Sequence, residues 1–572
     1  MKNIKILLIS FLLVVVSSII SITIFYPIFV SDTIIFKFAI HPFNICTEQP
    51  LLWNIIKLLF IITHIFSNFI FFNSILNRLL PKKQKEKKIP KTISKELVLD
   101  IGFNDSNLLS RLPEKSLYQN ILVTGAIGTG KTSSAMYPFT KQLIEYKSNN
   151  TEEKLGMLIL DVKGNYYSKV SEFASNSKRQ NDLIVIDLSG NIKYNPLDKP
   201  NLKPSVLADR LKTILLLFSP NNSESFWIDK AEQVLTEAIK FCRLYNNNYV
   251  TFVELHNLIF FKDYFYTKTQ YLKNLFLQNK LSKKDIYNLL SSLTFFEKEF
   301  FALDDRTLSI LRSEISRITN LFISDYDVKN TFCPNKEDIN FNGFSDVILK
   351  GKIVVLNMNI ATYKNLSKLI ATYLKLDFQS EVITRLNSLA FNNNSILDIF
   401  NSFSNRPVCF ISDEYQEYVT TSDSAFFAQS REAKCINIVS TQSYTSLLNA
   451  LNNPSSVKVI IQNLVNKLWF RNDDMFTIEE AQKQIGKEEK RKISKTISEN
   501  AKETNYNYFF NKFLSKNSNI SESYNSYFQK DFIYDTNFFT SNLETFSCLA
   551  FLSDSCNTIK PQKLKLIPYF KK

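Results

Sequence analysis

A cluster of glycines is the feature that most constrains what this chain can fold into. The chain has 572 residues and only ten glycines, yet Gly125, Gly128 and Gly130 fall within six positions. They belong to the run 125–132, Gly-Ala-Ile-Gly-Thr-Gly-Lys-Thr, which fits the pattern G-x-x-x-x-G-K-[ST]. Glycine lets the backbone turn tightly, so that successive N–H groups point at phosphate oxygens. The run therefore predicts a loop that binds the phosphates of a nucleotide.

The residues on either side of the loop have the pattern that phosphate binding requires. Residues 120–124 are predicted to form a short buried strand, and the residues from Ser133 onward a helix whose N-terminus faces the loop. In such a loop the Lys131 ammonium reaches the β- and γ-phosphates and the Thr132 hydroxyl binds Mg²⁺. A chance match in a surface loop is the alternative, and the flanking strand and helix argue against it. We expect ATP and Mg²⁺ to bind at Gly125, Ala126, Ile127, Gly128, Thr129, Gly130, Lys131 and Thr132.

Two adjacent carboxylates supply the second half of the predicted site. Asp413 and Glu414 follow the apolar run 408–411. An acidic pair at a strand end is commonplace, and by itself it is more often simply solvated. In a chain that also carries a phosphate loop, the pair predicts a hydrolytic site. Asp413 would hold Mg²⁺ together with Thr132, and Glu414 would act as the base that polarises the attacking water.

Three other residues are weaker candidates. Gln442 ends the next predicted strand and is either a sensor of the terminal phosphate or a turn residue. Arg431 precedes that strand; an arginine from a neighbouring subunit stabilises the transition state in ring ATPases, but on the residues alone a surface arginine is favoured. Asp161 ends another apolar run and either pairs with Lys163 or joins the water network of the site.

The composition argues against several kinds of site and indicates no particular partner. The seven cysteines form no C-x-x-C pair and there are only three histidines, so neither a disulfide framework nor a zinc site is expected. The formal net charge of +15 is concentrated near the two ends. Residues 81–95 hold seven lysines and one glutamate, and five more lysines lie between Lys560 and the C-terminus. The charge therefore gives no evidence for a DNA partner.

Two uncharged stretches near the N-terminus predict a membrane anchor. Residues 6–30 and 58–77 are each long enough to cross a hydrocarbon core of roughly 30 Å at about 1.5 Å per residue. A cleaved signal peptide is the competing interpretation of the first stretch, but its length and the lack of a small-x-small site argue for a span. The lysine cluster after the second stretch keeps that side in the cytoplasm. We expect a cell-membrane protein with two spanning helices, both termini cytoplasmic, and a short outer loop over 31–50.

Short apolar runs rich in β-branched residues indicate the fold of the remaining chain. They lie at 157–160, 183–186, 353–356, 408–411, 436–439 and 468–470. Helical patterns between them predict an α/β fold with a mainly parallel sheet, which binds ligands at the carboxyl ends of its strands. A last strand is expected at 548–552, after a stretch over 494–534 that is expected to be irregular.

The strand pattern disappears between 204 and 331, where apolar residues recur at helical spacing. This change predicts an all-α domain inserted into the α/β body. The expected division is a transmembrane anchor at 1–80, a basic juxtamembrane linker at 81–95, a nucleotide-binding domain at 96–203 and 332–572, and the all-α domain at 204–331. The second part of the nucleotide-binding domain includes a C-terminal extension.

Taken in order, these motifs resemble the type IV secretion coupling proteins, the TraG/TraD-like ATPases of conjugation machines. The resemblance runs from the membrane segments to about Gly486, and the C-terminal residues lie outside it. It rests on the phosphate loop followed by Pro138, on Asp161-Val-Lys-Gly164 (with Asn165 where an acidic residue is usual), Asn195-Pro-Leu197, Phe226-Trp227, Asp413-Glu-Tyr-Gln416, Arg431, Thr441-Gln-Ser443 and the residues 466–473 and 477–486.

The resemblance implies a membrane-anchored, RecA-like P-loop ATPase that assembles as a homo-hexameric ring, with Arg431 of one subunit facing the nucleotide of the next. Such a protein would take single-stranded DNA, a relaxase–DNA complex or effector proteins to the secretion channel. A protein-exporting or chromosome-segregating motor of the same superfamily would share the site and differ in cargo. A membrane cargo receptor that does not hydrolyse ATP is the alternative from another class, and it does not require the set Lys131, Thr132, Asp413 and Glu414.

Overall fold

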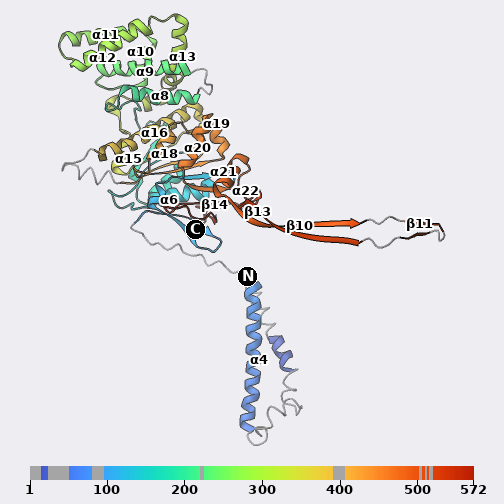
Figure 1. The fold of residues 1–572 in the computed structure, drawn as a ribbon. Coiled ribbons are helices and arrows are strands. Elements are labelled where there is room, and N and C mark those ends of the chain that lie inside the picture. The colour runs from blue at the N-terminus through green and yellow to red at the C-terminus, as the bar shows by residue number, and fades with distance from the viewer. Residues whose placement is uncertain are drawn as a thin grey trace. The chain divides into compact units, whose positions relative to one another are not determined.

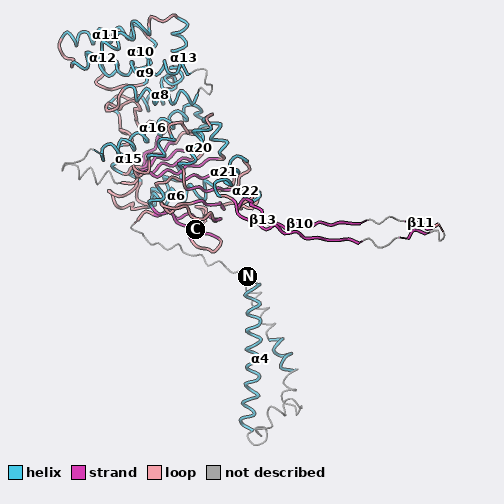
Figure 2. The backbone as a smooth tube through the Cα atoms, in the orientation of Figure 1, coloured by secondary structure: helices cyan, strands magenta, loops and turns pink. Residues whose placement is uncertain are grey.

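Figures 1 and 2 show the computed structural model of the chain. The described residues are 15–23, 50–79, 96–218, 225–390, 406–500, 505–508, 512–514 and 519–571. The chain divides into two compact units, Met1–Ile93 and Ser94–Lys572. The phosphate loop and the acidic pair both belong to the second unit.

The described part of the first unit is helical. Residues 15–23 form one helix and α4 (Pro50–Leu79) a longer one. They meet where Ser21 Oγ lies 2.5 Å from His64 Nε2. Among the helices that the structure describes, none combines the length and the apolar character that crossing a membrane requires. The predicted span at 6–30 lies largely outside the described residues. The one at 58–77 lies within α4, which does not meet that requirement, so the structure does not support this span.

An 11-stranded sheet is the centre of the second unit, in the order β2-β1-β15-β14-β9-β3-β8-β7-β4-β6-β5. All strand pairs from β9 to β5 are parallel. These strands are β3 (Ile121–Thr124), β4 (Gly156–Leu160), β5 (Leu183–Ile186), β6 (Ile353–Leu356), β7 (Val408–Ser412), β8 (Cys435–Thr441) and β9 (Asn466–Phe470). Each apolar run identified in the sequence forms one of them, and the predicted mainly parallel sheet is confirmed.

Antiparallel strands extend the sheet beyond β9. They are β14 (Ser547–Phe551), β15 (Gln562–Lys565), β1 (Val98–Asn104) and β2 (Leu109–Pro113). β14 is the strand predicted at 548–552, whereas charged residues interrupt the apolar pattern of β1, β2 and β15. Since β14 runs antiparallel to β9, with Cys548 paired to Phe470, it begins at the edge where the parallel strands end.

Helices cover both faces of the sheet, because alternate strand residues point to opposite sides. Ile121 and Val123 of β3 belong to one core, together with α6 (Tyr137–Glu145) and α7 (Tyr166–Asn176). Leu122 belongs to the core on the other face. The helices of that face are α15 (Ser345–Lys350), α16 (Ile360–Ala390), α18 (Asp423–Gln429), α19 (Tyr444–Leu451) and α20 (Pro454–Asn463).

From Pro204 to Phe332 the described residues form helices and turns without a strand. The helices are α8 (Pro204–Phe218), α9 (Ser225–Tyr245), α10 (Phe252–Phe260), α11 (Lys262–Leu277), α12 (Lys283–Thr294), α13 (Asp305–Ile323) and α14 (Tyr326–Phe332). Figure 1 shows α8 to α13 stacked in green on the side of α16. Side-chain oxygens of Thr251, Ser282 and Asp304 cap three of these helices. The division into domains stays a prediction.

The stretch expected to be irregular forms a long two-stranded ribbon instead. β10 (Lys487–Asn500) pairs antiparallel with β13 (Asn519–Phe532), and the shorter β11 (Asn505–Asn507) pairs with β12 (Lys512–Leu514). Figure 1 shows β10 and β13 projecting from the body, which they join through α21 (Met475–Ile485) and α22 (Thr536–Thr540). The expectation was wrong because cross-strand backbone pairing and exposed ion pairs such as Lys495–Glu522 link the two strands, and neither requires an alternating apolar pattern.

Candidate nucleotide-binding site

The loop Gly125–Thr132 follows β3 at the carboxyl edge of the parallel strands. Gly128 and Gly130 have φ angles of +80° and +93°, a region that residues with a Cβ rarely adopt. A Cβ at Gly128 would meet nothing within 4 Å, so the loop curves around open space there. A Cβ at Gly125 would lie 2.6 Å from Phe470 Cβ. The positive φ angles thus require glycine at positions 128 and 130, and close packing against Phe470 requires it at position 125.

Lys131 ends the loop where the following helix begins. A π-helical turn at Thr132–Met136 continues directly into α6, so the N-terminus of this helical segment faces the loop. The buried Lys131 Nζ donates hydrogen bonds to the carbonyl oxygens of Gly125 and, at 3.2 Å, of Ala126. Burial lowers the pKa of Lys131, and the nearby carboxylates of Glu414 and Asp413 oppose this shift. The loop therefore presents a buried cation and the N-terminus of a helical segment, which together favour phosphate.

Thr132 and Asp413 meet although they lie 281 positions apart in the chain. Thr132 Oγ1 donates a hydrogen bond to Asp413 Oδ2 at 2.8 Å, and Ser440 Oγ donates to Asp413 Oδ1 at 2.5 Å. Burial raises the pKa of Asp413, while the hydrogen bonds from Ser440 and Thr132 lower it. A hydroxyl and a carboxylate are oxygen ligands of the kind that Mg²⁺ prefers, and Mg²⁺ needs few protein ligands because phosphate and water complete its shell. The donor set fits Mg²⁺.

Glu414 is oriented by amide groups from two neighbouring segments. Its Oε2 accepts hydrogen bonds from Gln416 Nε2 at 2.8 Å and from Gln442 Nε2 at 3.2 Å. Its Oε1 lies 4.0 Å from Lys163 Nζ. The Glu414 backbone is left-handed, with φ of +51°, a conformation that costs a non-glycine residue about 1–3 kcal/mol and is frequent at functional sites. The arrangement presents one oriented carboxylate next to the predicted metal ligands.

The other predicted residues lie as follows. Gln442 reaches the site through Glu414, and Asn472 Nδ2 holds the Gln442 backbone at 2.9 Å. Asp161 Oδ2 accepts the N–H groups of residues 165 and 166 at 3.1 Å, so it caps α7, and Lys163 pairs with Glu414 instead. Arg431 is exposed and precedes β8, at the edge opposite to the end of that strand. The fold therefore does not bring Arg431 to the site of its own chain, and its role in a neighbouring site stays a prediction.

The sequence analysis did not identify two residues that contact the acids. Gln416 holds Glu414, and its own Oε1 accepts a hydrogen bond from Thr441 Oγ1 at 2.9 Å. Ser440 stands level with Asp413 because β7 and β8 pair in register, with residue 412 opposite residue 439. A signal existed for both residues. Gln416 lies two residues after the acidic pair, and Ser440 is a hydroxyl near the end of the strand next to β7.

The site thus combines a phosphate loop after β3 with an acidic pair after β7, two positions away in a mainly parallel sheet. No protein-family model and no curated protein matches the sequence. Among solved structures, the unbound bacterial conjugative coupling protein TrwBdeltaN70 is 12% identical with a TM-score of 0.50, over 80% of this chain and 87% of that chain. The plasmid coupling protein TrwB with the GTP analogue GDPNP gives the same identity, TM-score and shares. TrwB with ADP and Mg²⁺ is 11% identical, also with a TM-score of 0.50 over 80% and 87%. The predicted resemblance to coupling proteins is confirmed at the level of the fold.

Proposed function

We propose that this chain hydrolyses ATP and uses the energy to move a cargo. One observation carries the proposal: Thr132, Asp413 and Glu414 converge next to the phosphate loop, with 2.8 Å between Thr132 Oγ1 and Asp413 Oδ2. A protein that only binds a nucleotide needs the loop and not an oriented base beside it. The two amides that hold the Glu414 carboxylate support a hydrolytic role.

Each group in the site has a distinct task in this proposal. The loop N–H groups and Lys131 bind phosphate oxygens. Thr132 and Asp413 hold Mg²⁺, which when bound neutralises negative charge on the phosphates. Glu414 orients the attacking water and accepts its proton, and Gln416 and Gln442 keep its carboxylate in place.

We propose a coupling protein of a type IV secretion or conjugation channel, with single-stranded DNA or a relaxase–DNA complex as its cargo. The fold shared with the conjugative coupling protein TrwB and the ordered sequence motifs support this assignment. Six copies would form a ring. The exposed position of Arg431, away from the site of its own chain, suits a residue that acts on the neighbouring subunit.

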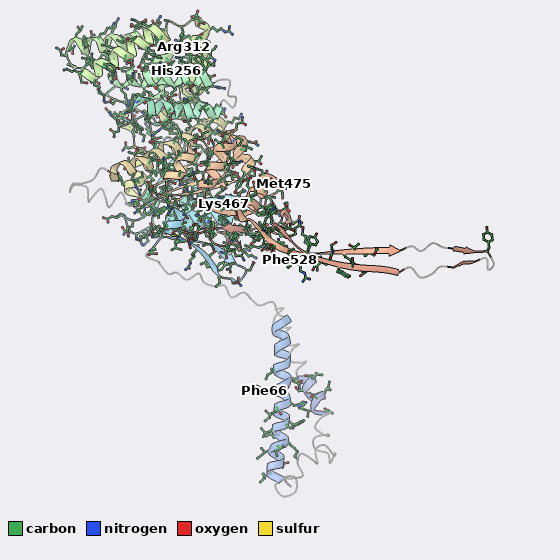
Figure 3. All side chains as sticks on the ribbon, viewed as in Figure 1. Phe66, His256, Arg312, Lys467, Met475 and Phe528 are labelled. Atoms are coloured by element: carbon green, nitrogen blue, oxygen red, sulfur yellow. The ribbon has the colours of Figure 1, made fainter. Side chains whose placement is uncertain are left out.

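We also propose that the first unit anchors the chain in the cell membrane, with both termini in the cytoplasm. Apolar side chains more than half exposed recur along α4, among them Phe66, labelled in Figure 3. They are Leu51, Ile55, Leu58, Leu59, Ile62, Phe66 and Ile70. Water disfavours such a surface, whereas lipid solvates it. The lysines at 81–95 support a cytoplasmic location for the body.

Two substitutions test the hydrolytic role. Lys131→Ala should abolish nucleotide binding and hydrolysis, and Glu414→Gln should bind ATP but hydrolyse it about 100-fold or more slowly, because it loses the base. Glu417→Gln is the matched control, since Glu417 lies on the same turn and pairs only with Lys368 at 3.0 Å among the interactions described. Rapid hydrolysis by Glu414→Gln would remove that residue from the mechanism. Wild-type DNA transfer by cells carrying Lys131→Ala would refute the motor.

The cargo requires a separate experiment. Co-purification of the full chain with a relaxase supports a conjugative coupling protein, whereas recovery of folded effector proteins or chromosomal DNA supports an exporting or segregating motor of the same superfamily. If the purified chain shows no ATP hydrolysis with single-stranded DNA present, the cargo receptor that does not hydrolyse ATP becomes the better hypothesis.

A further inference from the structure

We propose that Phe546 and Phe570, from the C-terminal segment of the chain, form a seat on which the base of the nucleotide stacks. This inference rests on the proposed function, because it concerns the nucleotide held by the same loop. It assigns a role to a part of the chain that lies outside the sequence resemblance.

The sheet order places the acids and the C-terminal segment on opposite sides of the phosphate loop. The loop follows β3; the acidic pair follows β7, beyond β8 on one side, and β14 lies beyond β9 on the other. Ser547, the first residue of β14, pairs with Lys565, the last of β15. Both strands are antiparallel in this region, so Phe546 and the residues after Lys565 emerge at the edge that carries the loop.

Phe546 is attached to the loop itself. Its N–H donates to the Thr129 carbonyl at 3.1 Å, and its own carbonyl accepts the Leu566 N–H at 2.8 Å. A Cβ at Gly130 would collide with the Phe546 ring, so the ring lies directly against the loop backbone. Phe546 has φ of +64°, a strained conformation for a bulky residue. The surroundings thus hold an aromatic ring next to the phosphate cradle at a cost in backbone energy.

The last residues of the chain complete the aromatic surface. Tyr569 N–H donates to the Ser133 carbonyl at 2.9 Å, on the first turn after the loop, and Figure 1 marks the C-terminus near α6 and β14. The Tyr569 ring meets the Tyr137 ring edge-on, with 5.1 Å between the two ring centroids. Phe570 is 56% exposed, and its ring centroid lies 6.0 Å from that of Phe546. A partly exposed pair of rings therefore faces solvent beside the loop.

The direction of a bound nucleotide follows from the same arrangement. Lys131 and the metal ligands Thr132 and Asp413 take the β- and γ-phosphate end, on the β7 side of the loop. The nucleoside end then extends away from the acids, toward β9 and β14, where Phe546 and Phe570 lie. Rings of this kind bind any base through its π-face and do not distinguish bases by hydrogen bonding. The seat should therefore accept adenine and guanine alike.

Calorimetric titration of the full-length chain tests this inference, with ATP, GTP and inorganic tripolyphosphate as ligands in the presence of Mg²⁺. We expect Phe570→Ala and Phe546→Ala each to weaken ATP and GTP binding by about 5- to 150-fold, the range for loss of one base–aromatic stack. Tripolyphosphate has no base, so its affinity should stay within about twofold. Phe528→Ala is the matched control, because Phe528 is an exposed phenylalanine on the ribbon (Figure 3).

Three results would overturn the seat: unchanged ATP affinity in both variants, an equal loss for ATP and tripolyphosphate, or a wild-type preference between ATP and GTP above about 100-fold. An equal loss would mean that the rings act on the phosphate loop. Failure of the wild-type chain to bind either ATP or tripolyphosphate would instead contradict the proposed function. The two hypotheses therefore fail in different ways.

Discussion

Two regions of the molecule depart from the usual pattern of apolar side chains inside and charged side chains outside. The edge of the sheet that carries the site buries charged side chains, whereas the β10–β13 ribbon exposes apolar ones. At the edge, Asp413 and Glu414 are almost fully buried and each accepts several hydrogen bonds. On the ribbon, Ile493 and Phe528 are 65% and 71% exposed. The ribbon's ion pairs, such as Lys495–Glu522 at 2.8 Å, also lie in solvent. Removing one hydrogen-bond partner of the buried acids should therefore lower the free energy of unfolding, whereas the exposed side chains of the ribbon contribute little to that free energy.

A buried ion pair supports the segment that follows the acids. Lys375 of α16 donates to Asp423 Oδ2 at 2.5 Å and to the Tyr418 carbonyl at 2.7 Å, and both charged side chains are fully buried. Tyr415, next to Glu414, donates its hydroxyl to the same Asp423 oxygen. This network fixes the chain directly after Glu414, which explains how the strained backbone of that residue persists.

The largest effect on stability is expected from Lys375→Met. Removing the cation leaves Asp423 charged and buried without its partner, which costs about 3–5 kcal/mol. Denaturant unfolding of the full chain measures this loss. Lys495→Met on the ribbon is the matched control, because an exposed pair contributes about 0–1 kcal/mol. If both variants lost the same amount of unfolding free energy, buried and exposed ion pairs would contribute equally, and the difference between the two regions would be refuted.

A smaller effect of opposite sign is expected from Asp413→Asn. Burial raises the pKa of Asp413 above its usual value of 3.8, so the folded chain loses stability as pH rises through that raised pKa. Without nucleotide or Mg²⁺, the asparagine variant should be more stable than wild type at neutral pH and unfold at a higher temperature. The difference should vanish well below pH 3.8, where the carboxyl group is protonated in both the folded and the unfolded state. A variant less stable than wild type at pH 7 would contradict this account, and ATP hydrolysis should be lost in either case.

The smallest effect is expected from shortening the ribbon. Replacing residues 494–525 by Asn-Gly joins Ile493 to Ser526, which already face each other across the strands, through a turn that suits a hairpin. The unfolding free energy of the body should change by less than about 0.5 kcal/mol, because a two-stranded ribbon adds little independent stability. ATP affinity should be unchanged. A loss of about 2 kcal/mol or more would show that the ribbon and the body unfold as one unit.

The sequence by itself determined the features that depend on neighbouring residues. Short apolar runs specify the strands from β3 to β9, and glycine spacing specifies the phosphate loop, because both are local preferences of the backbone. The candidates Lys131, Thr132, Asp413 and Glu414 followed from motifs of a few residues each.

Only the tertiary structure decided which of these residues meet. The order β3-β8-β7 brings Thr132 to Asp413 and Ser440 level with that carboxylate, while the same order leaves Arg431 at the opposite edge. The antiparallel return of β14 and β15 brings Phe546 and the C-terminal residues to the loop, and backbone pairing makes a ribbon from a polar stretch. Contacts between residues hundreds of positions apart depend on strand order and direction, and these arise from the packing of the whole chain rather than from any local run of residues.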